Sequence, residues 1–169
     1  MKNFTKILSL GVLLLFACSM QLSAQKCISE KDPITGESTI KADQISIFDF
    51  QKGVGFTFNK VSEEYYIDVI IGTSGYSGDV LTPDDELIIK LANGKTITFK
   101  TKENVNPTLQ AFGWSNYTYK VSVSKEEMQN MANSNLIFIR FSISNKKFDL
   151  TPSDKDGKKV VKAATCILK

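Results

Sequence analysis

The sequence predicts an all-β protein, an antiparallel β-sandwich of about nine or ten strands with one short α-helix. From about residue 37 onward, short segments alternate apolar and polar residues, the period of two that is typical of strands. Turn-forming residues separate these segments at short intervals. Helical spacing of apolar residues occurs once, at about residues 125–133. A closed β-barrel is the alternative architecture.

Alternation is clear in the first half of this region. Ile45 and Ile47 alternate with Ser46 and Phe48, and the segment 54–58 repeats the pattern with Val54, Phe56 and Phe58 on one face. A nearly continuous apolar run at 65–71 predicts a further strand. The segments 87–92 and 95–100 flank Asn93-Gly94, which predicts a hairpin with a type I′ turn.

The second half of the region contains the predicted helix between two strands. Tyr117–Val123 and Ile137–Ile143 alternate as strands do. Asp156-Gly157 predicts a last hairpin turn, followed by a strand at Val160–Leu168.

Ser124-Lys125-Glu126-Glu127 is a capping box, which marks a helix start. Met128, Met131 and Ala132 then share one helical face. We interpret this face as a packing surface and expect the helix to end near Asn133.

Residues 1–24 are typical of a secretory signal peptide, with Lys2 and Lys6 before an apolar run too short to span a bilayer. We favour cleavage after Ala24, which leaves residues 25–169 as a single β-sandwich domain. The alternative is a lipoprotein anchored through Cys18. Either route places the protein outside the cytoplasm, in the periplasm or beyond the cell.

Two cysteines, Cys27 and Cys166, remain after cleavage at Ala24. An even number in an exported chain predicts a disulfide, here one that clasps the two ends of the sandwich. Two unrelated reduced thiols are the alternative. The sequence has no C-x-x-C motif, which argues against thiol redox chemistry and a zinc knuckle.

Composition excludes several classes of function. Net charge is +3 and falls to +1 without residues 1–24, so the chain lacks the strong positive charge of nucleic-acid-binding proteins. The sequence contains no histidine, which excludes Ser-His-Asp and Cys-His catalysis and histidine-ligated zinc. Arg140 is the only arginine; we expect it to bridge a carboxylate, and a ligand-clamping role is the alternative.

An aromatic segment is the strongest candidate for recognition. Trp114, the only tryptophan, could stack on a sugar ring, while Asn116 and the loop residue Tyr76 could contact its hydroxyl groups. The alternative is that Trp114 seals one end of the core.

The acidic clusters favour turns over metal sites. Asp84-Asp85-Glu86 follows Thr82-Pro83 and directly precedes a strand, where neighbouring side chains point to opposite faces. Asp154-Lys155-Asp156-Gly157 lacks the outer oxygen ligands of a calcium loop. We therefore predict no catalytic residue, metal site or cofactor.

The chain resembles secreted proteins of Bacteroidetes-type bacteria for which no activity is established. The resemblance lies in four features: the segment from Tyr119 to Met128 and on to Phe141, the preceding hairpin at Leu87–Lys100, the late Cys166, and Ser23-Ala24-Gln25. It implies an exported β-sandwich and supplies no catalytic residue or ligand.

Together these features predict an exported, non-enzymatic β-sandwich that binds a protein or glycan at the cell envelope, without a membrane span. Two alternatives remain: a structural accessory domain that assembles through edge strands, and a carboxylate-dependent polysaccharide hydrolase.

Overall fold

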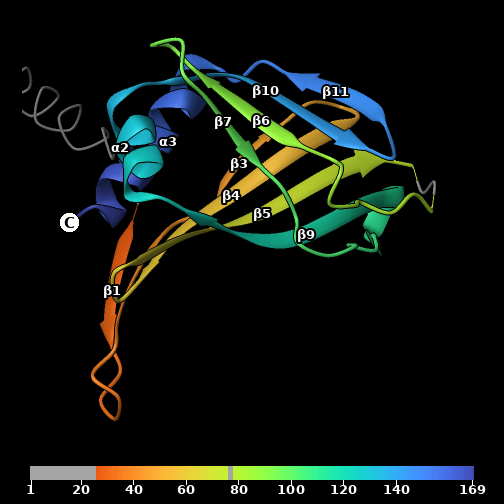
Figure 1. The fold of residues 1–169 in the computed structure, drawn as a ribbon. Coiled ribbons are helices and arrows are strands. Elements are labelled where there is room, and N and C mark those ends of the chain that lie inside the picture. The colour runs from red at the N-terminus through yellow and green to blue at the C-terminus, as the bar shows by residue number, and fades with distance from the viewer. Residues whose placement is uncertain (1–25, 76–77) are drawn as a thin grey trace, which may run out of the picture.

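The computed structural model describes residues 26–75 and 78–169, which form two antiparallel β-sheets and two α-helices (Figure 1). This confirms the predicted all-β sandwich class, with eleven strands in the described part of the chain. The larger sheet has the order β1-β2-β4-β5-β9-β8, and β3 pairs with β4 beside β2. The smaller sheet has the order β11-β10-β6-β7.

The strands of the larger sheet are β1 (Cys27–Lys31), β2 (Ser38–Ala42), β3 (Ile45–Phe48), β4 (Lys52–Val61), β5 (Glu64–Ser74), β8 (Thr108–Leu109) and β9 (Trp114–Val123). Those of the smaller sheet are β6 (Leu87–Leu91), β7 (Thr96–Phe99), β10 (Leu136–Ile143) and β11 (Lys146–Leu150). A short 3-10 turn, η1 (Ala111–Gly113), precedes β9.

The core lies between the two sheets and follows from the alternation of each strand. In β5 the side chains of Tyr65, Ile67, Val69 and Ile71 are buried, while the residues between them are only half-buried on the outer face. Apolar side chains of the smaller sheet and of both helices complete the same core. The outer face of β5 therefore remains partly accessible to solvent.

Helix α2 (Lys125–Asn133) has the predicted bounds. The backbone N–H of Glu127 donates to Ser124 Oγ at 3.2 Å, and the N–H of Ser124 donates to the Glu127 carboxylate at 2.8 Å. Met128 and Met131 are fully buried, which confirms that their helical face is a packing surface.

The predicted last hairpin at Asp156-Gly157 and strand at Val160–Leu168 are wrong, because this segment is helix α3 (Asp154–Ile167). Ser153 caps the helix by accepting from the N–H of Asp156 at 3.2 Å. Its buried residues are Gly157, Val160, Ala163, Ala164, Cys166 and Ile167, a helical spacing.

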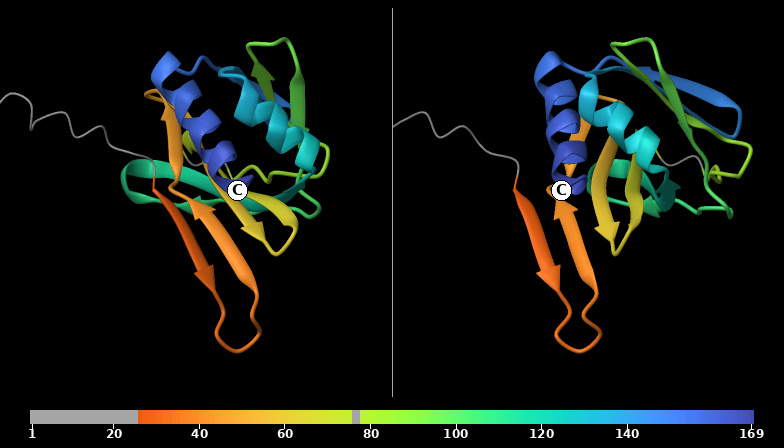
Figure 2. Two further views of the ribbon diagram at one scale, coloured as in Figure 1. Left: turned by 90° about the vertical axis from the view of Figure 1, so that its left-hand side faces the viewer. Right: turned by 60° about the vertical axis from the view of Figure 1, so that its left-hand side comes forward.

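Helix α3 packs beside α2 and against β2, β3, β4 and β10, which closes one side of the sandwich (Figures 1 and 2). The spacing of the apolar residues of α3 fits a helix, and the contacts with these strands bury its apolar face. A strand here would leave this side of the core open.

The β6–β7 hairpin is confirmed, but its predicted type I′ turn is wrong. Only Gly94 in the turn has a positive φ, and Leu91 pairs with Lys95 across a three-residue loop. Ala92 and Asn93 donate backbone hydrogen bonds to Asn135 and Ser134 at 2.8 and 3.0 Å. These contacts with the segment between α2 and β10 explain the longer loop.

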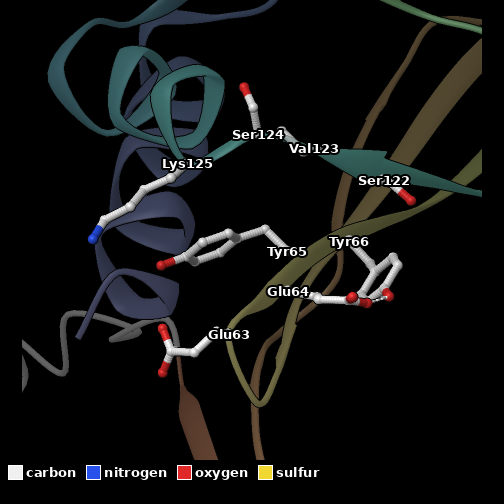
Figure 3. Close-up of a pocket in the computed structure, with 8 residues that line it drawn as sticks. All are labelled: Glu63, Glu64, Tyr65, Tyr66, Ser122, Val123, Ser124 and Lys125. Carbon is white, nitrogen blue, oxygen red and sulfur yellow. Dashed lines mark hydrogen bonds between the residues drawn. The ribbon is translucent and has the colours of Figure 1, made fainter.

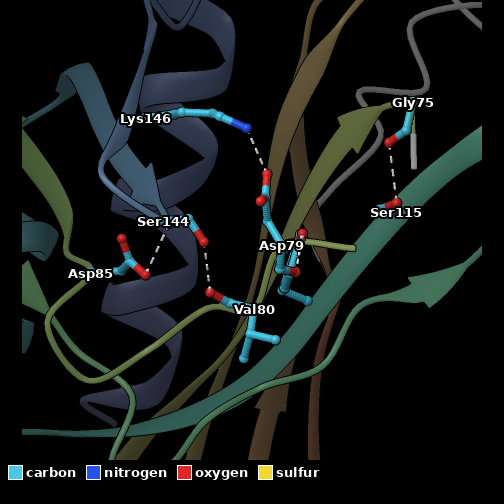
Figure 4. Close-up of polar contacts among 8 residues, drawn as sticks. Gly75, Asp79, Val80, Asp85, Ser115, Ser144 and Lys146 are labelled. Carbon is cyan, nitrogen blue, oxygen red and sulfur yellow. Dashed lines mark hydrogen bonds and ion pairs between the residues drawn. The ribbon is translucent and has the colours of Figure 1, made fainter. Parts of the chain in front are cut away.

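The turn with two positive-φ positions is instead Ser144-Asn145, between β10 and β11 (φ 49° and 67°). Ser144 also takes part in a polar network that holds the 79–86 segment (Figure 4). Its hydroxyl donates to the carbonyl of Val80 at 3.3 Å, and Lys146 pairs with Asp79 at 2.8 Å.

Asp85 is the buried member of the acidic cluster, and its contacts confirm a turn. Its N–H donates to the carbonyl of Thr82 at 3.0 Å, and its carboxylate accepts from Thr82 N–H at 3.0 Å and Ser144 N–H at 3.3 Å. Burial by itself raises the pKa of Asp85, but the hydrogen bonds from Thr82 and Ser144 outweigh burial and lower its pKa below the usual value.

The lowered pKa predicts how stability depends on pH. The carboxylate of Asp85 stabilises the fold above pH ~4 and ceases to do so as the pH falls through its folded pKa. We expect Asp85→Asn to lower the free energy of unfolding by about 1.5 kcal/mol at pH 7, and by clearly less at pH 3. Urea unfolding at both pH values measures this difference. Asp84→Asn, an exposed neighbour, is the control; an equal loss at both pH values would contradict the assignment.

Cys27 and Cys166 form the predicted disulfide, with Cα atoms 5.9 Å apart. The bond connects the first strand to the last helix and therefore brings the two ends of the described chain together. The β1–β2 hairpin projects from the body of the protein, and the disulfide lies at its base (Figure 2).

Candidate functional site: a groove with a glycine floor

An open groove of about 440 Å³ lies on the outer face of the larger sheet, across β3, β4, β5 and β9. We call it the glycine groove. Its lining residues are Gln44, Ser46, Ile47, Phe48, Gly53, Val54, Gly55, Ile70, Gly72, Gln110, Ala111, Trp114 and Asn116.

Strand register explains why the floor is flat. Phe48 pairs with Gly53, Gly53 with Gly72, and Gly72 with Asn116, so these residues form one row across four strands. The two central members have no side chain, and both are buried beneath the side chains of Phe48, Asn116 and Trp114. A glycine inside a strand often marks the close approach of another group.

Aromatic rings form two walls of the groove. A Cβ atom added to Gly72 would lie 3.3 Å from the Trp114 ring, and one added to Gly53 would lie 2.8 Å from Phe48 Cβ. Phe48 is 74% exposed, whereas Trp114 is half-buried. Because Ser115 and Tyr117 face the core, Trp114 points to the outer face and does not seal the core.

The turn before β9 contains the lining residue Ala111 and an exposed aromatic residue next to it. Phe112 lies in η1 with φ 61° and is fully exposed. A bulky residue in this left-handed region is strained, and such strain often occurs at functional sites. Hydrogen bonds from Gln110 N–H to Trp114 and from Gly75 N–H to Gly113 hold the turn in place.

The polar groups of the groove are neutral. Gln44 Nε2 donates to Ser46 Oγ at 3.3 Å and lies 3.1 Å from the position of a Cβ atom on Gly55. Asn116 Oδ1 lies 3.1 Å from the equivalent position on Gly72. No described residue that lines the groove carries a charge. The arrangement can stack a ring and exchange hydrogen bonds with neutral polar groups.

The structure brings together two of the predicted binding residues, Trp114 and Asn116, in this groove. The third, Tyr76, lies outside the described residues. Sequence reasoning did not identify the floor and the opposite wall, formed by Gly53, Gly72 and Phe48. Two features of the sequence indicate these residues: Phe48 lies at an outward position of its strand, and glycines alternate with other residues in the next strand.

Arg140 lies on the outer face of the smaller sheet, away from the groove. Its guanidinium forms a bidentate pair with Asp149, with both N–O distances at 2.7 Å, which confirms the expected carboxylate partner. Hydrogen bonding to Arg140 lowers the pKa of Asp149.

A second pocket of about 410 Å³ lies where the β5–β9 ladder ends (Figure 3). We call it the ladder-end pocket. It is lined by Glu63, Glu64, Tyr65, Tyr66, Ser122, Val123, Ser124 and Lys125.

Two properties of residues 26–75 and 78–169 concern a membrane span and a metal site. No helix in this part of the chain has the length and apolar character needed to cross a bilayer. The same residues contain no cluster of three or more acidic, cysteine or histidine side chains placed to hold a metal ion. Compared with models of protein families and with curated protein sequences, the chain matches none.

Proposed function

We propose that this protein is an exported, non-enzymatic binding module that holds a neutral glycan in the glycine groove. The observation that carries this proposal is the row Phe48, Gly53, Gly72 and Asn116, with Trp114 lying against Gly72. Aromatic faces can stack on the C–H face of a sugar ring, and neutral amides can bond its hydroxyl groups. Gly53 and Gly72 let the Phe48 and Trp114 side chains lie close to the sheet, where a sugar ring can contact them.

Export is supported by two features of the chain. Residues 1–24 are typical of a signal peptide but lie outside the described residues. The Cys27–Cys166 disulfide favours an oxidising compartment such as the periplasm or the extracellular space. The same compartments contain the polysaccharides that a glycan-binding module would meet.

The accessible face of Trp114 favours ligand binding over a purely structural role, for which we would expect the ring to be buried. A polysaccharide hydrolase would need two carboxylates facing each other across the bound sugar. The described lining of the groove contains neither Asp nor Glu, which favours binding without hydrolysis.

The test is a panel of neutral glycans against residues 25–169, followed by titration calorimetry. The fluorescence of Trp114, the only tryptophan, provides a second readout at the groove itself. We expect Trp114→Ala to weaken binding by at least about 30-fold, since central aromatic residues dominate binding energies. Asn116→Ala should weaken it by roughly 5- to 10-fold through a lost hydrogen bond.

Two further variants test whether glycan binding depends on the glycine groove. Gly72→Ala places a methyl group against the Trp114 ring and should weaken binding without removing any side chain. Ile34→Ala changes a 93% exposed residue at the tip of the β1–β2 hairpin and should leave affinity unchanged. Equal binding by wild type and Trp114→Ala would refute the proposal. If a protein ligand binds through Trp114 and glycans do not displace it, the groove recognises a protein and the glycan proposal is wrong.

A further inference from the structure

The two pockets of this protein lie along the same pair of strands. In register, the outward-facing pairs of β5 and β9 run from Gly72–Asn116 through Ile70–Thr118 and Asp68–Lys120 to Tyr66–Ser122. The first pair lines the glycine groove, and the last lines the ladder-end pocket. One uninterrupted face of the sheet therefore connects them.

The separation of the pockets exceeds the size of one sugar ring. Tyr66 lies six positions before Gly72 along β5, a distance of roughly 20 Å at the usual rise of a strand. A single small ligand in the groove cannot reach Tyr66, whereas a linear oligomer lying along the strands can contact both pockets.

The surface between the pockets suits a neutral polar chain. Asp68 accepts a hydrogen bond from Asn59 Nδ2 at 2.9 Å and pairs with Lys120 at 3.8 Å, so its charge is balanced. Lys120 also lies 5.5 Å from the centre of the Tyr66 ring. The lysine is 62% exposed and retains donors for ligand hydroxyl groups.

The ladder-end pocket contains an aromatic ring on the same outer face. Tyr66 is half-buried and belongs to the last outward-facing pair of the row. Its hydroxyl donates to Glu64. Tyr65, beside it, lies on the inner face of β5 with Ile67 and Val69, away from a ligand on the outer face. The Tyr66 ring therefore gives a second surface on which a sugar can stack.

We propose that the ligand is a linear neutral oligosaccharide that lies along β5 and β9, with one ring in the glycine groove and its far end on the Tyr66 ring in the ladder-end pocket. This inference rests on the proposed glycan binding and adds the length and direction of the ligand. Each additional sugar between the pockets gains contacts until the chain reaches Tyr66, after which further sugars add none.

The test uses ladders of β-1,4-glucan, α-1,4-glucan and β-1,4-xylan oligosaccharides, from two to eight sugars, in titration calorimetry. We expect affinity to rise with length and then to plateau. Tyr66→Ala removes a half-buried surface ring, so the variant should fold. It should lose about tenfold in affinity for the longest chains and leave the shortest unchanged. Tyr119→Phe, on the inner face of β9, is the matched control.

The outcomes separate the two proposals. Loss of binding at all lengths in Trp114→Ala, together with loss only for long chains in Tyr66→Ala, supports both. Affinity that is independent of length, or unchanged by Tyr66→Ala, overturns the extended ligand and leaves binding in the groove intact. Failure of wild-type protein to bind any glycan of the panel or the ladders overturns both.

Discussion

Replacing both Cys27 and Cys166 with serine should lower the free energy of unfolding by about 4–5 kcal/mol. The bond closes a loop with a sequence separation of 139 residues, and the loop-closure model assigns a stabilisation of this size to such a crosslink. Urea unfolding of residues 25–169 and of the double variant measures the change. The slope of the transition should increase, because an unfolded chain without the crosslink exposes more surface.

The structure also predicts which strands the double variant destabilises. All five residues of β1 are exposed, so its pairing with β2 has little apolar cover beyond the disulfide at its base. In the double variant, amide exchange should accelerate in β1 and β2 while β5 remains protected. Ser29→Ala, on the exposed surface of β1, serves as the control for substitution alone. Unchanged exchange in β1 would contradict the view that the disulfide holds the hairpin.

Replacing Gly157 with alanine should lower the free energy of unfolding by about 2–3 kcal/mol. In an exposed helix this change stabilises, since alanine is the better helix former. Here a Cβ atom would lie 2.6 Å from the carbonyl oxygen of Leu136, and a backbone atom cannot rotate away. Helix α3 would have to move off β10, and such overpacking costs energy.

Lys162→Ala provides the matched control for Gly157→Ala. Lys162 lies on the exposed side of the same helix, so the substitution should change stability by no more than about 0.5 kcal/mol. Thermal and urea unfolding of both variants measure the difference. If Gly157→Ala is neutral or stabilising, the close contact between α3 and β10 is wrong.

The sequence predicts correctly those parts of the fold that depend on contacts between residues close together in the chain. The capping box between Ser124 and Glu127 closes over four residues, so α2 could be placed to the residue. The β6–β7 hairpin likewise follows from two alternating segments around Asn93-Gly94. Its turn type was wrong because hydrogen bonds from Ala92 and Asn93 to the distant residues Asn135 and Ser134 decide the loop.

Helix α3 was missed for a related reason. Asp156-Gly157 is a strong turn signal, and the sequence does not reveal that Gly157 is needed for close contact with Leu136. The apolar residues at 160, 163, 164 and 167 do carry helical spacing. In the sequence the turn signal outweighs this spacing, so the prediction is a strand where the structure has a helix.

The candidate site could be predicted only in part. Trp114 and Asn116 are two residues apart on one strand and so share a face, which alternation alone predicts. Phe48, Gly53 and Gly72 join them through the register of four strands, and register depends on pairings over long sequence separations.

By itself, the sequence determined the all-β class, helix α2 and the disulfide partners, because periodicity, capping and cysteine parity are local or countable properties. Only the tertiary structure decided that α3 closes the sandwich and that two glycines align beneath two aromatic rings. Those features depend on strand register and on contacts between backbones distant in sequence.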